Sequence, residues 1–429
     1  MSAPPAGILS LPPEITQRIF KECLPTRSNA PGPSLPSTEP SQLSQQAPLL
    51  LTQICRGWRG ISLDTPQLWQ SIVVNAPVSP LMVGLWMSRG GNLPRDISFT
   101  AYDEKEGTYF LEESMDYCLQ WRDVELSLPM ESFSAVTHHG PFPLLSSLSL
   151  STTSGVFDGD QTIAFQGAPL LLQATLREFP FLAPDIAWGQ LTTLDMTAHQ
   201  ADEGIATLQN CTGLVDLQFL LLDHAQNGIP PLTLLSLRSL KTAGHSILPL
   251  LITPNLERLA IWGPGFSNDM DLLTTSLHDL LERSACPLGY LSFRTPPDIP
   301  AAAFKAFLEA APSVTELALT FQFSNGLEKL VTVLQSADVL PKLTTLRIMD
   351  MSRAAEATMP FDPLLDTLRV RRDAVDGRTT LEMLSLSIRS RSQGPGRVCP
   401  NAALSKFAGL AEEGLRIRIV CDGIVLMGE

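Results

Sequence analysis

A short apolar pattern that returns along most of the chain limits the folds available to it. The pattern reads Leu-x-x-Leu-x-Leu with small variations, so its last two apolar positions alternate with other residues. This alternation places both side chains on one face of a short strand, and the first leucine anchors the turn into it. The central residue of the clear copies is Leu148, Leu194, Leu217, Leu259, Leu291, Leu317, Leu346 or Leu384, and weaker copies surround Val124, Ala174 and Leu240.

Segments with helical spacing separate these expected strands. Between Phe266 and Leu281, apolar residues recur every three or four positions, and residues 304–308 and 327–334 show the same spacing. Each unit is therefore a strand and a helix, and neither half can bury its apolar face alone. Neighbouring units must stack into a solenoid with a curved parallel sheet on its inner side and helices outside. This pattern resembles that of leucine-rich repeats.

The expected repeats are irregular. The step from Leu194 to Leu217 fits the roughly 20 to 29 residues of such repeats, whereas the step from Leu346 to Leu384 is longer. Regular repeats hold Asn or Cys three positions after the last apolar residue of the strand. Here that position holds Thr153, His199, Leu222, Pro264, Pro296, Gln322, Met351 or Arg389. We therefore expect different turn hydrogen bonds in each unit and uneven curvature. The competing interpretation is an ordinary α/β domain whose parallel strands happen to contain leucine.

The first 75 residues have a different, helical pattern. Pro12 and Pro13 stand where the first N–H groups of a helix lack partners, and Glu14 suits the positive end of a helix. Ile15, Ile19 and Cys23 then recur at four-residue spacing, with Phe20 and Leu24 beside them. The spacing predicts one amphipathic helix.

Two further helical elements are expected before residue 75. The apolar residues Leu51, Ile54, Cys55, Trp58 and Ile61 predict a second helix, and a third short element carries Leu68 and Trp69 after the break at 64–66. The insert at 25–48 is rich in Pro, Ser and Gln and too poor in apolar groups to offset the entropy of ordering. We interpret it as a disordered loop.

The segment from Leu11 to Leu24, together with 54–59 and Leu68-Trp69, resembles an F-box. In that family the unit docks on the Skp-type adaptor of a cullin-RING ubiquitin ligase. The resemblance implies that the adaptor contacts Leu11, Pro12, Ile15, Ile19, Leu68 and Trp69. Such aliphatic and aromatic anchors dominate the buried centre of interfaces. The alternative is that these residues pack only against one another, which we favour for Ile54 and Trp58.

We therefore expect an α/β protein in three parts. Residues 1–75 form the F-box-like helical domain, 76–144 form a joining segment, and 145–429 form the irregular leucine-rich-repeat array. The joining segment contains a short helix at Leu81, Leu85 and Trp86, followed by early, imperfect strands at Ile97–Phe99 and Val124–Leu126. These first units should pack directly against the F-box and make a rigid join.

Composition excludes several classes of function. Acidic residues outnumber basic ones by 44 to 30, giving a formal charge of −14, so nucleic acid and anionic lipid are disfavoured partners. Apolar runs such as Ile247–Ile252 are far too short to span a bilayer, and the N-terminus lacks the pattern of a signal peptide. We expect a cytoplasmic or nuclear protein. The seven scattered cysteines form no CxxC pair and should be reduced, mostly buried thiols.

No motif supports catalysis. The chain contains no GxGxxG, GxxxxGK[ST], GxSxG or HExxH sequence. The pair His138-His139 lacks the further ligands of a tetrahedral metal site, and Asp158-Gly159-Asp160 lacks the distal glutamate of a calcium loop. We expect a polar loop and a solvated turn there, with no catalytic residue, metal or cofactor.

The surface expected to act is the exposed side of the inner sheet. The candidates for substrate binding flank the buried strand positions and are Asp195, Leu220, Trp262, Arg294, Thr320, Arg347 and Met349. Trp262 is the sharpest candidate because tryptophan is enriched among interface anchors, although it could instead cover neighbouring repeats. Arg294 and Arg347 could attract an acidic or phosphorylated segment, or could simply pair with acidic neighbours.

The leading hypothesis is a non-catalytic substrate receptor of an SCF-type (Skp-cullin-F-box) ubiquitin ligase, which holds the adaptor through its first helices and a target protein through the array. The alternative is a scaffold that binds a partner without directing ubiquitin transfer. A third class, a transferase on an α/β fold, would require a cleft of convergent titratable groups.

Overall fold

The computed structural model contains two compact units, Met1–Thr197 and Ala198–Glu429, which are considered separately below. The structure describes residues 11–24, 47–75, 79–136, 139–154, 163–180, 184–198, 201–221, 229–262, 270–296, 299–321, 326–336, 338–351, 361–372, 380–388, 401–421 and 424–428. The boundaries expected at residues 75 and 144 stay predictions.

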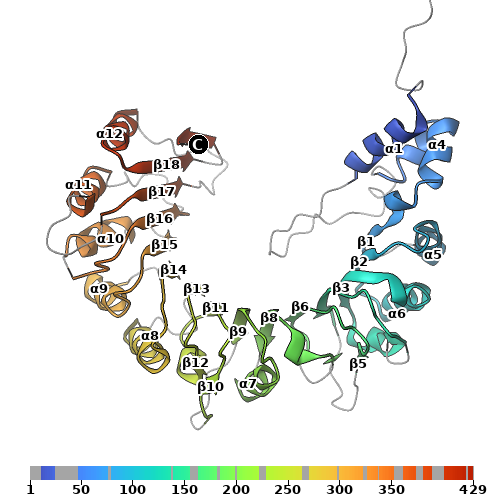
Figure 1. Ribbon diagram of the computed structural model, residues 1–429, viewed down its shortest axis with the longest axis horizontal. Helices are drawn as coiled ribbons and strands as arrows, with labels where there is room; N and C mark the ends of the chain where they lie inside the picture. The colour runs from blue at the N-terminus through green and yellow to red at the C-terminus, as the bar shows by residue number, and fades with distance from the viewer. Residues whose placement is uncertain are drawn as a thin grey trace, which may run out of the picture. The chain divides into compact units, whose positions relative to one another are not determined.

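The first unit begins with short helices and continues as a parallel sheet (Figure 1). The helices are α1 (Pro13–Glu22), α3 (Leu51–Ile54), α4 (Arg56–Leu63) and the 3₁₀ helix η2 (Pro66–Trp69). The strands are β1 (Ser71–Asn75), β2 (Arg95–Thr100), β3 (Trp121–Leu128), β4 (Ser147–Thr152), β6 (Gln173–Arg177) and β8 (Thr193–Ala198), paired in that order. Between them lie α5 (Pro80–Arg89), α6 (Glu104–Met115), the 3₁₀ helices η3 (Cys118–Gln120), η4 (Met130–Val136) and η5 (Trp188–Gln190), and the two-stranded pair β5 (Ile163–Ala164) and β7 (Pro184–Asp185).

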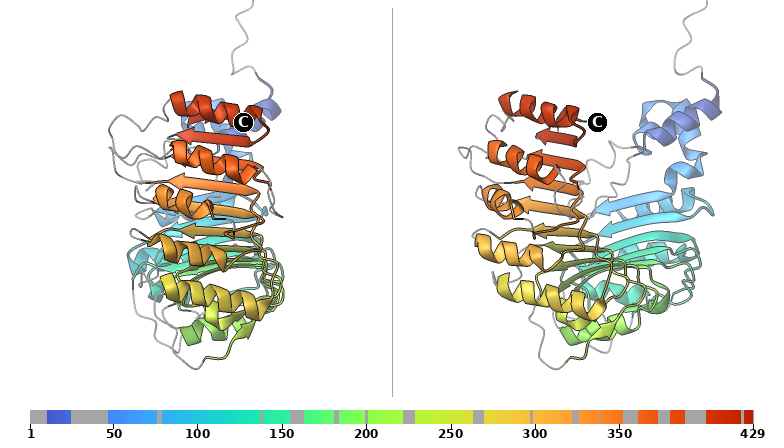
Figure 2. Two further views of the ribbon diagram at one scale, coloured as in Figure 1. Left: turned by 90° about the vertical axis from the view of Figure 1, so that its left-hand side faces the viewer. Right: turned by 60° about the vertical axis from the view of Figure 1, so that its left-hand side comes forward.

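The second unit is a longer run of strand and helix repeats. Its parallel strands are β9 (Asp216–Leu221), β11 (Ser239–Ala243), β13 (Arg258–Trp262), β14 (Tyr290–Arg294), β15 (Glu316–Phe321), β16 (Thr345–Asp350), β17 (Met383–Ile388) and β18 (Arg416–Cys421), and β19 (Ile424–Met427) pairs antiparallel with β18. Its helices are α7 (Ala201–Gln209), α8 (Met270–Ser284), α9 (Ala301–Glu309), α10 (Gly326–Leu334), α11 (Phe361–Arg372), α12 (Asn401–Glu412) and the 3₁₀ helix η6 (Leu248–Leu250), with a short pair β10 (Leu232–Thr233) and β12 (Leu251–Ile252). Helices α8 to α12 lie on one side of this sheet (Figures 1 and 2). We call the opposite side the open face.

Repeat leucines lie side by side across the strands. Leu259 is in register with Leu291, which is in register with Leu317, and all three are fully buried. The row continues through Leu346 and Leu384. Burying each leucine stabilises the fold by roughly 1.5 to 3 kcal/mol relative to exposure, so the row holds successive repeats together. The strands also pair in chain order in each unit, as stacked repeats require. The α/β fold with parallel strands and outer helices, resembling a leucine-rich-repeat solenoid, is thus confirmed.

Two of the turns after the strands share a backbone hydrogen bond. The N–H of Thr153 donates to the carbonyl of Leu128 at 3.0 Å, and the N–H of Met351 donates to the carbonyl of Phe321 at 2.7 Å. Thr153 adds a bond from its hydroxyl to the carbonyl of Ala101 at 2.8 Å, so the two turns differ only in this side-chain contact, and different hydrogen bonds in every unit stay a prediction. Several positions of the expected ladder lie outside the described residues, namely His199, Leu222, Pro264, Gln322 and Arg389. Residues 25–46 of the expected loop do as well.

The expected second helix is divided at Cys55. This residue has extended backbone geometry, with a φ of −157°, and separates α3 from α4. Its thiol accepts a hydrogen bond from the backbone N–H of Trp58 at 3.4 Å. Because Cys55 caps a new helix in this way, the prediction of one continuous helix is wrong, although the apolar spacing spans both pieces.

A buried arginine on α11 ties down the segment between α10 and β16 in the second unit. Arg371 of α11 is almost fully buried and donates four hydrogen bonds to backbone carbonyls. Its Nε reaches Leu334 at 2.7 Å, and its Nη2 reaches Ser336 at 2.9 Å and Val339 at 2.8 Å. The guanidinium therefore satisfies carbonyls that the end of α10 leaves without helical partners.

Replacing Arg371 with methionine should lower the free energy of unfolding by about 3 kcal/mol or more, because several buried carbonyls would lose their donors. Urea denaturation followed by circular dichroism measures this loss. Arg369→Met is the matched control, because Arg369 lies on the same helix but is exposed, and among the described residues it pairs with Asp366 at 3.2 Å. It should change stability by less than about 0.5 kcal/mol. Equal unfolding midpoints for the two variants would contradict this role.

Candidate adaptor-docking helix and open sheet faces

Helix α1 is anchored to its own domain by residues between the predicted ones. Its buried side chains are Thr16 and Phe20, which are one turn apart. The ring of Phe20 is fully buried and packs edge-on against Trp58, with 4.9 Å between ring centroids. The expectation that Trp58 packs within the hairpin is therefore confirmed.

The regular apolar stripe of α1 faces outward. Ile15 is 42% exposed, Leu11 and Cys23 are also exposed, and Ile19 is half-buried. We call these four residues the outward stripe of α1. Ile15 and Ile19 lie one turn apart on the helix, Cys23 is its C-cap, and Leu11 precedes the N-cap residue Pro12. The helix thus buries a threonine and leaves an isoleucine partly in solvent, which forgoes part of the roughly 1.5 to 3 kcal/mol that full burial of the side chain would contribute.

The other predicted adaptor residues divide between surface and core. Pro12 is exposed beside the outward stripe, but Leu68 and Trp69 are each only 1% exposed. Side chains buried to that degree cannot contact a partner, so the structure corrects the assignment of Leu68 and Trp69 to the adaptor surface. The sequence misled because large apolar residues suit a domain core as well as an interface.

Trp69 instead joins the helices to the first repeat. Its Nε1 donates to the carbonyl of Ser62 at 2.8 Å, and its ring packs edge-on against Trp86 of α5 at 5.0 Å. The guanidinium of Arg89 lies over the same ring, 4.6 Å from the centroid. Strand β1 begins at Ser71, two residues later. The expectation that the first repeats pack directly against the F-box-like helices is confirmed.

Sequence reasoning missed other exposed apolar residues in this region. Ile54 is 51% exposed, so the expectation that it packs within the hairpin is wrong, and Leu50, one turn earlier, is also exposed. Leu81 and Leu85 are exposed on α5, again one turn apart. Four-residue spacing was the available signal, but spacing alone does not tell which side of a short helix meets the core.

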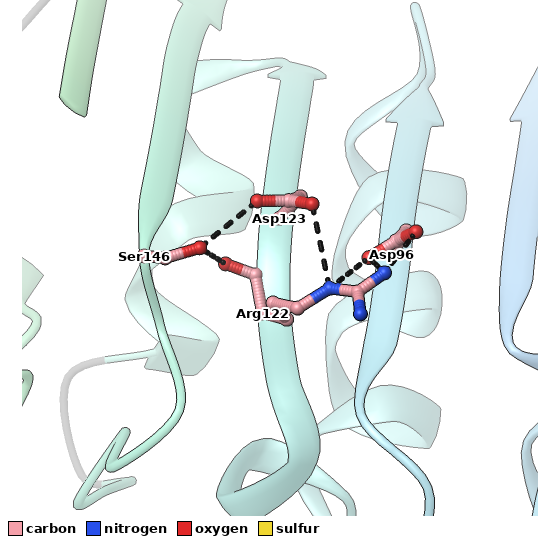
Figure 3. Close-up of polar contacts among 4 residues, drawn as sticks. All are labelled: Asp96, Arg122, Asp123 and Ser146. Carbon is pink, nitrogen blue, oxygen red and sulfur yellow. Dashed lines mark hydrogen bonds and ion pairs between the residues drawn. The ribbon is translucent and has the colours of Figure 1, made fainter. Parts of the chain in front are cut away.

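We call the side of the first unit's sheet opposite α5 and α6 the open face of that unit; it is acidic, and its arginines Arg122 and Arg177 are paired with aspartates. Figure 3 shows Arg122 making a two-pronged contact with Asp96, at 2.9 and 2.7 Å, while the hydroxyl of Ser146 donates to Asp123 at 3.0 Å. The predicted substrate residue Asp195 lies on β8, and its carboxylate accepts hydrogen bonds from both Nε and Nη2 of Arg177. This carboxylate is thus already neutralised by its neighbour.

The other six predicted substrate residues lie on open-face strands of the second unit. Trp262 is 44% exposed at the end of β13, and Leu220 is exposed on β9. Arg294, Thr320 and Met349 are half-buried and in register on β14, β15 and β16. Arg347 is exposed on β16 and pairs with Glu316 on the next strand at 2.6 Å. The structure places these side chains on one sheet face, and their role in binding stays a prediction.

The described residues contain no group of three or more His, Cys, Asp or Glu side chains able to hold a metal ion. His139 is exposed, while His138 and Asp158-Gly159-Asp160 lie outside the described part of the chain. Buried thiols are protonated: desolvation raises the pKa of Cys211 to about 12 and also raises the pKa of Cys118.

Comparison with known proteins finds a family match in the first part of the chain. Residues 8–75 match the F-box-like domain family, and F-box domains generally bind Skp-type adaptors. No curated protein matches the chain. Among solved structures, the crystal structure of a TLR13–ssRNA13 complex is similar, with 15% sequence identity over 68% of this chain and a TM-score of 0.28. The match spans about half (48%) of that protein. None of the helices in the described ranges is long and apolar enough to cross a membrane.

Alkylation at about pH 8 should distinguish the exposed from the buried cysteines, because iodoacetamide reacts with the thiolate. Cys23 is exposed and should be labelled in the native protein. Cys211 is buried and has a pKa of about 12, so it remains protonated and should be labelled only after denaturation. Mass spectrometry of the peptides measures both. Rapid native labelling of Cys211 would show that its surroundings open to solvent.

Proposed function

We propose that this chain is a non-catalytic substrate-recognition subunit of an SCF-type ubiquitin ligase. The F-box-like match at residues 8–75 supports the adaptor-binding part of this proposal. The partners would be a Skp-type adaptor, through it a cullin-RING ligase, and a protein target. Such a complex would place the chain in the cytoplasm or nucleus.

The observation that carries the proposal is the outward stripe of α1. The helix is held by Thr16 and Phe20, so its orientation is set by packing within its own domain. Ile15 is thereby presented to solvent on a helix whose orientation is already determined, and Leu11 is exposed directly before that helix begins. Exposed aliphatic side chains on a preorganised helix are suited to the centre of an interface, because few groups remain to be ordered on binding. We therefore assign the adaptor contact to the outward stripe and Pro12.

The open faces of the repeats would select the target. A parallel sheet with solvent-facing side chains offers an extended surface of the kind that repeat proteins use for binding. The chain would then act by proximity: it raises the local concentration of the target beside a charged conjugating enzyme. No group of this chain need be covalently modified.

A second candidate function is a scaffold that binds the same adaptor without directing ubiquitin transfer. The F-box-like match fits this candidate equally well, because it concerns only adaptor binding. The two candidates differ in whether a target held by the repeats becomes ubiquitinated.

Replacing Leu11 and Ile15 with serine should weaken adaptor binding at least about tenfold, because truncating anchor side chains can cost about 2 kcal/mol or more. The melting temperature should fall only slightly, since Leu11 and Ile15 are already 37% and 42% exposed. Calorimetric titration with the purified adaptor measures the affinity. Lys21→Ser is the control, because Lys21 is exposed on the other side of α1 and should bind normally. Unchanged affinity in the double variant would reject the assigned surface.

A reconstituted ligase separates the two candidate functions. With the adaptor, cullin, RING subunit and charged conjugating enzyme present, a target bound to the repeats should acquire ubiquitin at a rate that falls when Leu11 and Ile15 are changed to serine. A chain that assembles with the adaptor and binds its target, yet supports no transfer above the level without the chain, would favour the scaffold.

A further inference from the structure

The open face of the second unit carries an excess of positive charge, although the whole chain has a formal charge of −14. Its solvent-facing strand positions hold more cations than anions. We call the following cations the basic face: Lys241, Arg258, Arg294, Arg347, Arg416 and Arg418. The acidic residues at equivalent positions of these strands are Asp216 and Glu316. This surface therefore has a sign opposite to that of the protein.

Strand register places three of these cations in one row. Lys241 on β11 is in register with Ala260 on β13, and the same row passes through the following strands to Arg347 on β16 and Arg418 on β18. Neighbouring strands are about 4.8 Å apart, so the row from β11 to β18 spans roughly 30 Å. That is the length of an extended segment of about nine residues.

Local partners compensate the basic face only in part. Arg347 pairs with Glu316 at 2.6 Å, and Arg416 reaches Glu382 at 3.3 Å. Lys241 and Arg418 form no ion pair with any residue that the structure describes. The two ends of the row are therefore the places where positive charge is least neutralised.

The first unit provides an internal comparison. Its open face uses the same parallel architecture, but it carries Asp96, Asp123, Glu125 and Asp195. Its arginines lie beside carboxylates, as in the pair of Arg122 with Asp96. An excess of cations is therefore not a consequence of the repeat architecture, since the fold tolerates either sign at these positions.

Large apolar side chains lie among the cations. Trp262 is exposed on β13, and Met349 and Met383 are half-buried on β16 and β17. The guanidinium of Arg258 lies over the ring of Tyr290, 4.1 Å from its centroid, and forms a flat cationic surface on the same sheet face. A ligand that matches this face needs both negative groups and apolar side chains.

We propose that the basic face binds an extended protein segment in which aspartate and glutamate alternate with apolar residues. This inference rests on the proposed function, in which the repeats select a target protein. Carboxylates of the segment would meet Lys241, Arg347 and Arg418 along the row, and its apolar residues would pack on Trp262 and the methionines.

Charge distribution favours such a segment over nucleic acid. A polyanion extending beyond the basic face would be repelled by the net charge of the protein, whereas a short segment interacts mainly within a Debye length of about 8 Å at physiological salt. Apolar groups such as Met349 also have no partner on a phosphate backbone. An oligonucleotide is therefore a competing ligand in the test below.

The experiment uses the full chain bound to its adaptor and fluorescent peptides of about twelve residues. One peptide alternates glutamate with leucine and alanine, and the other has glutamine in place of glutamate. Fluorescence anisotropy at about 0.1 M salt should show binding of the glutamate peptide only. Raising the salt to about 1 M shortens the Debye length from about 10 to 3 Å and should weaken that binding.

The double variant Lys241→Gln with Arg418→Gln should bind the glutamate peptide about fivefold more weakly, since each exposed charge contributes modestly. Lys305→Gln with Arg369→Gln is the matched control, because it removes one lysine and one arginine from the outer helices α9 and α11. It should change affinity by less than about twofold. Reversing Lys241 and Arg418 to glutamate should abolish the preference for the glutamate peptide over the glutamine peptide, because the face would then hold as many anions as cations.

Three results would overturn the inference: equal binding of the two peptides, equal weakening by the two double variants, or tighter binding of a single-stranded RNA or phosphoserine peptide of equal charge. Co-purification of the adaptor is measured for every variant in parallel. If the chain binds the adaptor but shows no charge-dependent peptide binding, the inference about the basic face is rejected and the proposed function is not. Loss of adaptor binding in the Leu11 and Ile15 variant affects only the F-box-like part.

Discussion

The structure depends on burying one face of every strand beneath the next element of the chain. Leu259, Leu291 and Leu317 stand in one fully buried row because each strand pairs in register with its predecessor. A single unit of strand and helix cannot cover its own apolar side, so cohesion comes from the contact between units. Once this row is buried, the alternate residues of the same strands must face the other way. The open face is therefore a direct consequence of the core.

The N-terminal helices follow the same rule with a different outcome. Phe20 and Trp58 form a small core, and Trp69 connects that core to Trp86 in the first repeat helix. A domain of this size buries little surface by itself, and the packing of Trp69 attaches it to a larger body. Trp69 lies at the C-terminal end of the helical segment, so its contact with Trp86 does not cover the outward stripe of α1. Phe20, Trp58 and Trp69 thus carry the packing of this segment, and the outward stripe, the proposed adaptor contact, takes little part in it.

The two open faces show how one architecture can carry different chemistry. In the first unit Arg122 and Arg177 each contact an aspartate, so the surface is acidic with internal pairs. In the second unit Lys241 and Arg418 stand at the ends of a row without ion-pair partners among the described residues. Because these positions point away from the core, their identity does not affect the packing of the leucines. Selection for binding can therefore act on them independently of the fold.

The sequence by itself determined the class of fold, because alternation along Leu384 and Leu386 or spacing along α1 is a local property set by backbone geometry. It also identified which strand residues, such as Trp262 and Arg347, avoid the core. Only the tertiary structure decided that α1 buries Thr16 and Phe20, that Trp69 lies in the core, and which cations share one row. Those outcomes depend on which surfaces meet and on register between strands distant in sequence, and neither is encoded in the spacing of a single segment.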